Sequence, residues 1–160
     1  MVSRNFAAAI HLGFAALLVF TYSEKALASG PGLPPVETPE SREATAQKFV
    51  SQALQVWQAR LNLKDWNIHV QLVHPNQLEP KTLGNVHWNI NNKHATIDVL
   101  SSYDYTLPMS PMLNDMEMTV VHELIHLHLA VLPRSDATRR NEEYVVNQIS
   151  RALLDLSKHE

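Results

Sequence analysis

The sequence Thr119-Val120-Val121-His122-Glu123-Leu124-Ile125-His126-Leu127-His128-Leu129 contains a His-Glu-x-x-His pattern inside an apolar run with helical character. Successive residues of a helix turn by about 100°, so His122 and His126 lie about 40° apart on one face. Two imidazoles at this spacing can bind one metal ion, whereas Glu123 is poorly placed to share it. A carboxylate beside a metal suits a general base that takes a proton from water. The pattern therefore predicts a zinc site with Glu123 as the base.

Histidine is abundant in this chain, at 9 of 160 residues, so a chance match has to be weighed. At these His and Glu frequencies, the five-residue pattern is expected by chance in roughly 3 of 100 such chains. The alternative is that these histidines are satisfied core residues with no metal. The context favours a metal, because polar side chains beside Val121, Leu124 and Ile125 would be costly in a core unless something satisfied them.

The composition is that of an ordinary globular protein. The chain has 160 residues, 45% hydrophobic and 18% charged, which is enough for one compact domain with a hydrophobic core. Its net charge is −3 and its basic residues form no long run, so neither nucleic acid nor an anionic membrane surface is an expected partner. Cysteine is absent, so a metal would have to be held by histidine, carboxylate or water.

The amino terminus predicts a targeting segment. Arg4 precedes an apolar stretch, and Ala26-Leu27-Ala28-Ser29 has small residues at the positions that a signal peptidase reads. Residues 1–28 are therefore interpreted as a signal peptide, with an uncleaved membrane anchor as the alternative, and the protein is expected to be secreted or periplasmic. A proline-rich linker, 29–39, and a single folded domain, 40–160, follow. No stable membrane insertion is expected after cleavage.

Hydrophobic periodicity predicts one helix and three strands before the motif. Thr38 and Pro39 resemble a helix N-cap with proline at the first position, and apolar residues at three- and four-residue steps predict a helix from about 39 to 62. Alternation of apolar and polar residues predicts a half-buried strand at 66–72 and a hairpin at 84–100. Three histidines fall on or near the polar side of these strands and are interpreted as solvent-facing: His69, His87 and His94.

Two further helices complete the predicted order. Asn114, with Glu117 three residues later, predicts a capping box before a motif helix from about 115 to 131. Asp136 can cap a third helix. The predicted inward stripe of that helix consists of Val145, Ile149, Ala152, Leu153 and Leu156. The expected fold class is α+β, with an N-terminal helix, a three-stranded and mostly antiparallel sheet, the motif helix and a C-terminal helix that carries a metal ligand.

A catalytic zinc site needs a third protein ligand. His128 lies about 200° around the helix from His126, so it does not readily reach the same ion and is interpreted as a structural or second-site histidine. Glu142 and Glu143 on the third helix are the next candidates. Glu143 is preferred because Asn147 lies four residues on, on the same face, as a hydrogen-bonding partner beside the metal; Glu142 is then interpreted as solvated or salt-bridged. The predicted ligands of one Zn²⁺ ion per chain are His122, His126 and Glu143.

The motif followed by Glu143 resembles the gluzincin metallopeptidases. More narrowly, Glu143-Tyr144-Val145-Val146-Asn147-Gln148-Ile149-Ser150 is similar to the Glu-x-x-Ala-Asn-x-Phe-Ala stretch of ImmA/IrrE-like metallopeptidase domains, with Val146 and Ile149 in place of Ala and Phe. The resemblance implies a minimal zincin-like fold, two His and one Glu as zinc ligands, and the motif Glu as general base. It also implies that substrate backbone binds as an added strand at a sheet edge, which would fall on residues 94–100.

The sequence thus predicts a zinc-dependent peptidase that acts on a peptide or protein substrate. Glu123 would take a proton from water and pass it to the leaving amine. The alternative is a catalytically inactive zinc-binding structural or interaction module, in which the metal stabilises the fold. The oxyanion of the reaction needs a further donor, for which Tyr103, Tyr105 and His94 are open candidates.

Overall fold

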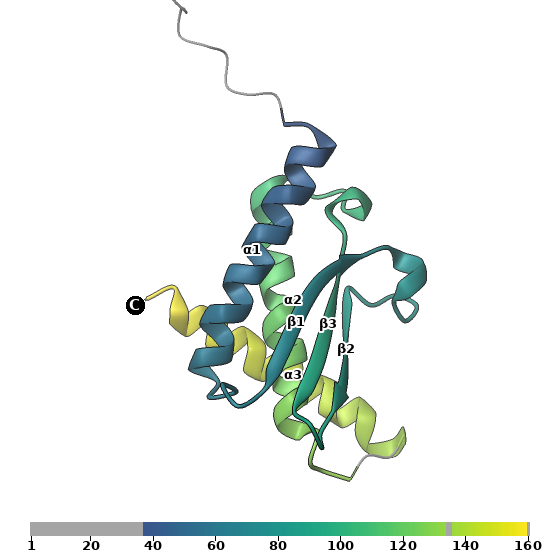
Figure 1. Cartoon of the computed structure of the whole chain (residues 1–160), viewed down its shortest axis with the longest axis vertical. Helices are drawn as coiled ribbons and strands as arrows, with labels where there is room; N and C mark the ends of the chain where they lie inside the picture. The colour runs from purple at the N-terminus through teal and green to yellow at the C-terminus, as the bar shows by residue number, and fades with distance from the viewer. Residues whose placement is uncertain (1–36, 134–135, 160) are drawn as a thin grey trace, which may run out of the picture. The chain divides into compact units, whose positions relative to one another are not determined.

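Figure 1 shows the computed structural model of the chain, which describes residues 37–133 and 136–159. The predicted signal peptide, 1–28, and most of the predicted linker lie outside the described residues. Within the described part of the chain, no helix combines the length and the apolar composition needed to cross a membrane. The elements described are three α-helices and a three-stranded sheet, so the predicted α+β class is confirmed.

Helix α1, Pro39–Arg60, begins where Thr38 and Pro39 predict. The Thr38 hydroxyl accepts a hydrogen bond from the Ser41 backbone N–H at 3.2 Å, and the Ser41 hydroxyl accepts one from the Thr38 N–H at 2.9 Å. This reciprocal pair satisfies amide groups that the start of a helix leaves unpaired. The buried face of α1 consists of Ala46, Val50, Ala53, Leu54 and Trp57. It packs against the motif helix and forms one wall of the core.

The sheet has the strand order β1-β3-β2, where β1 is Asn67–Val73, β2 is Gly84–Asn89 and β3 is His94–Leu100. β1 pairs with β3 in parallel, and β2 pairs with β3 antiparallel. The sheet is therefore mixed, and the prediction of a mostly antiparallel sheet is wrong. The expectation of a free edge at 94–100 is also wrong, because β3 is the central strand. It carries the most deeply buried strand residues, with Ile97 and Val99 fully enclosed.

The two faces of the sheet differ as the alternation predicts. Apolar residues such as Val70 and Ile97 belong to the core shared with the helices. The polar residues form the opposite face, where the Asn67 amide and the His94 ring lie 3.0 Å apart and the His87 ring lies 3.7 Å from the Asp98 carboxylate. The strand histidines thus face away from the motif helix.

Helix α2, Met109–Leu129, carries the His-Glu-x-x-His motif and begins earlier than predicted. Asn114 and Glu117 lie inside the helix, so the predicted capping box is wrong. The earlier turns are stabilised by burial, since Met112 is fully enclosed in the core. Glu117 instead accepts a hydrogen bond from the indole N–H of Trp57 at 2.8 Å, which connects α2 to α1.

Helix α3, Asp136–Ser157, begins at the predicted residue but buries a different face. It crosses α2 obliquely near the C-terminal end of that helix (Figure 1). Val146 and Ser150 are fully buried, and the Ser150 hydroxyl donates to the Val146 carbonyl at 2.8 Å. Because the Ser150 side chain is small and its hydroxyl is hydrogen-bonded within its own helix, α3 can approach α2 closely. The predicted stripe is wrong at Val145, Ile149, Ala152 and Leu156, which are exposed, and only Leu153 packs against the core.

Substitutions at two adjacent valines of α3 test which face of this helix is buried. Val146 is fully buried whereas Val145 is 46% exposed. We expect Val146→Ala to lower the free energy of unfolding by about 2 kcal/mol, because it removes buried methyl groups and leaves a cavity. Val145→Ala is the matched control and should change it by less than about 0.5 kcal/mol. Urea unfolding measures both, and equal losses would mean that α3 does not bury the face described.

Candidate metal centre

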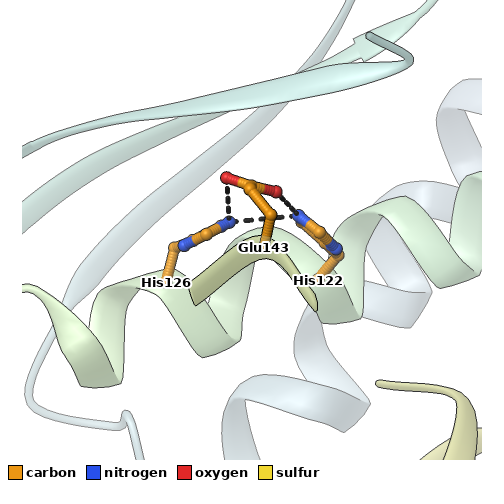
Figure 2. A group of neighbouring side chains, drawn as sticks. All are labelled: His122, His126 and Glu143. Carbon is orange, nitrogen blue, oxygen red and sulfur yellow. Dashed lines mark hydrogen bonds and ion pairs between the residues drawn. The ribbon is translucent and has the colours of Figure 1, made fainter. Parts of the chain in front are cut away.

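The two motif histidines project from α2 on the side that faces the sheet (Figure 2). Their Nε2 atoms lie 3.0 Å apart, and their ring planes are inclined by 68°. The His122 side chain is 16% exposed and that of His126 is 8% exposed. The helical spacing therefore brings both imidazoles to one point, as predicted from the motif.

Glu143 completes this group from α3. Its Oε2 lies 3.2 Å from Nε2 of His122, and its Oε1 lies 3.4 Å from Nε2 of His126. Figure 2 shows the carboxylate above both rings. Within the described residues, His122, His126 and Glu143 are the one group of three candidate ligands that the structure brings together, with all ligand atoms within 4.8 Å of one another. It is the set expected from the sequence.

The spacing of the three ligand atoms fits a tetrahedral zinc ion. Zinc binds imidazole nitrogen and carboxylate oxygen at about 2.0–2.2 Å, which places two tetrahedral ligand atoms about 3.3–3.6 Å apart. The two Nε2 atoms lie 3.0 Å apart, and each lies 3.2 Å or 3.4 Å from its nearer Glu143 oxygen, so the three groups converge at separations close to that size. Glu143 is 44% exposed, so one side of this group is open to solvent, where a fourth ligand could enter.

α3 also places polar side chains beside the two histidines. A Glu142 carboxylate oxygen lies 2.8 Å from Nδ1 of His126, and the Glu142 side chain is only 14% exposed. Asn147 lies near enough to His122 to influence its pKa, while its amide nitrogen donates to the Glu143 carbonyl at 2.9 Å. Of the two interpretations of Glu142, the solvated one is wrong, because the crossing of α3 over α2 encloses the side chain, whereas the salt-bridged one fits its contact with His126.

Burial favours the neutral form of His122, which is the form that binds a metal. Desolvation lowers the pKa of His122 below its usual value, and the adjacent His126 lowers it further. Glu143 and Asn147 oppose this shift without reversing it. A neutral imidazole keeps a lone pair available as a ligand.

Glu123 belongs to α2, and its carboxylate lies near Gly84, the first residue of β2. Glu123 is 6% exposed. A Cβ atom at Gly84 would lie 3.6 Å from Oε1 of Glu123, 2.7 Å from the Asp98 carbonyl oxygen and in steric overlap with the Thr119 methyl group. Only glycine allows the β2 backbone to approach α2 this closely, and no sequence pattern around Gly84 predicts the contact.

The remaining candidates lie elsewhere. Nε2 of His128 lies 2.8 Å from the Leu61 carbonyl oxygen, which fits the structural interpretation of this residue. His94 lies on the outer face of the sheet, so it is not an oxyanion donor. The Tyr105 hydroxyl donates to Asp115 at 3.1 Å, and burial, with a further contribution from Asp115, raises its pKa. Tyr103 is half-exposed, and no described contact connects it to the metal ligands.

Comparisons with protein-family models, with curated proteins and with solved structures found no match for this chain. The resemblance to gluzincins therefore stays a prediction from the motif residues.

Gly84 provides a direct test of the close contact above Glu123. We expect Gly84→Ala to lower the free energy of unfolding by about 1–3 kcal/mol, because the new methyl group overlaps Thr119 and the Asp98 carbonyl. Thr119→Ser removes the overlapping methyl group and keeps the hydroxyl that donates to the Asp115 carbonyl. The double variant should recover part of the loss in urea unfolding, with Thr119→Ser alone as the control. A fully stable Gly84→Ala variant would contradict the contact.

Proposed function

We propose that the protein is a zinc-dependent peptidase in which His122, His126 and Glu143 hold one zinc ion per chain. The observation that carries this proposal is the convergence of two Nε2 atoms, 3.0 Å apart, with a carboxylate whose two oxygens lie 3.2 Å and 3.4 Å from them, on the side of α2 that faces the sheet. A buried Glu123 follows His122 on the same helix. The group has the ligand number and atom types of a catalytic zinc site.

Glu123 has the chemistry of the general base. When bound, zinc polarises a peptide carbonyl and makes water more acidic. Glu123 would accept the proton that the water loses and then deliver it to the leaving amine. The Glu123 carboxylate is shielded from bulk solvent and lies beside the start of β2.

The free edge of β2 is the proposed site for the substrate backbone. In the described part of the chain, β2 has a strand on one side only, since the sheet order is β1-β3-β2. β2 packs against α2, and its first residue, Gly84, lies beside Glu123. An extended peptide can add to such an edge through main-chain hydrogen bonds. The same proposal includes export directed by residues 1–28.

Glu123→Gln separates zinc binding from catalysis. The variant should bind zinc as the parent does, because Glu123 is not a ligand, while cleavage falls by about 10²- to 10⁴-fold through loss of the base. Binding is measured by elemental analysis of tag-free protein. Cleavage is measured on fluorescein-labelled casein and on a mixed-sequence peptide library read by mass spectrometry. Glu40→Gln, in the first turn of α1, is the matched control and should cleave at the parental rate.

Two outcomes would contradict the proposal. A Glu123→Gln variant that hydrolyses peptides as fast as the parent would remove Glu123 from the mechanism. A parent protein that holds one zinc per chain but cleaves neither substrate would favour the non-enzymatic zinc module, whose further sign is a large loss of melting temperature with chelator.

A further inference from the structure

We propose that Glu142 is a positioning residue that orients His126 for metal binding. This inference rests on the proposed zinc site but not on peptidase activity. The two successive glutamates of α3 contact opposite nitrogens of one ring: Glu142 lies 2.8 Å from Nδ1 of His126, and Glu143 lies 3.4 Å from Nε2. Glu142 and Glu143 therefore have different roles, although they are adjacent and chemically identical.

The contact fixes which nitrogen of His126 carries the proton. A carboxylate accepts hydrogen bonds and cannot donate them when ionised, so Nδ1 of His126 donates to Glu142. The lone pair of a neutral ring is then on Nε2, which is the atom nearest to His122 and Glu143. Metal-binding histidines commonly use such a second hydrogen bond to set the tautomer.

The contact also fixes the orientation of the ring. Rotation of the imidazole by 180° about its bond to Cβ would exchange Nδ1 with Cδ2 and Nε2 with Cε1. A carbon atom would then face Glu143, and the site would lose a ligand. The hydrogen bond from Nδ1 to Glu142 opposes this rotation, and the burial of both side chains, at 8% and 14% exposed, limits competition from water.

Glu142 is excluded as a ligand in this arrangement because it lies on the side of the His126 ring away from the other two ligand atoms. Its contact with a ring nitrogen at 2.8 Å differs from the position of Asn147, a neutral amide that lies near His122. A hydrogen bond to a carboxylate is about twice as strong as one to a neutral acceptor. Loss of Glu142 should therefore weaken zinc binding more than loss of Asn147.

Zinc affinity and the spectrum of the cobalt-substituted protein test this role without any assay of cleavage. We expect Glu142→Ala to weaken zinc binding by about 10- to 100-fold in competition with a chromogenic chelator. Glu142→Gln should weaken it less, because the amide oxygen still accepts from Nδ1. The visible spectrum of bound Co²⁺ should shift in Glu142→Ala and return toward the parental spectrum in Glu142→Gln. Gln148→Ala, exposed on the same helix, is the control.

Folding of each variant is checked by circular dichroism. If Glu142→Ala does not fold, the zinc affinities of Glu142→Gln and Asn147→Ala are compared instead. An unchanged zinc affinity and cobalt spectrum in the Glu142 variants would overturn the proposal. A loss in Glu142→Gln as large as that in Glu143→Gln would overturn it in favour of Glu142 as a ligand. A parent protein that binds no zinc would overturn this inference and the proposed function together. Failure to cleave peptides would overturn the proposed function alone.

Discussion

The crossing of α3 over α2 is the contact on which the candidate site depends. α2 supplies two imidazoles, but the Glu143 carboxylate and the Glu142 hydrogen bond to His126 come from α3. The crossing is stabilised by Val146 and Ser150, both fully buried. A different rotation of α3 would bury Val145 and Ile149 and turn Glu143 away from the histidines. The packing of small and branched side chains therefore determines the chemistry of the site.

Features that depend on local sequence could be predicted. Thr38 and Pro39 mark the start of α1 because capping is a local interaction between neighbouring residues. The strands follow from the alternation of side chains, and the proximity of His122 and His126 follows from helix geometry alone. Glu143 could be selected because Asn147, on its own helix, marked the face of α3 that points toward the motif.

Features that depend on packing between distant segments could not be predicted. Hydrophobicity alone pointed to Val145 and Ile149 as the inward stripe, but the polar contacts of Glu142 and Glu143 and the small size of Ser150 favour a different face. The central position of β3 likewise depends on the pairing of strands far apart in sequence, with the loop 74–83 placing β2 on the opposite side of β3 from β1. Gly84 has no sequence signal, because its role is visible only when β2 lies against α2.

X-ray absorption spectroscopy of the zinc-loaded protein tests most directly whether His122, His126 and Glu143 form a zinc site. A zinc ion held by these residues should show a tetrahedral shell of nitrogen and oxygen atoms at about 2.0–2.2 Å. The outer-shell scattering should be that of two imidazoles and should fall to that of one in His126→Ala. A six-coordinate oxygen shell, or a spectrum without imidazole scattering, would contradict the assignment of these residues as zinc ligands.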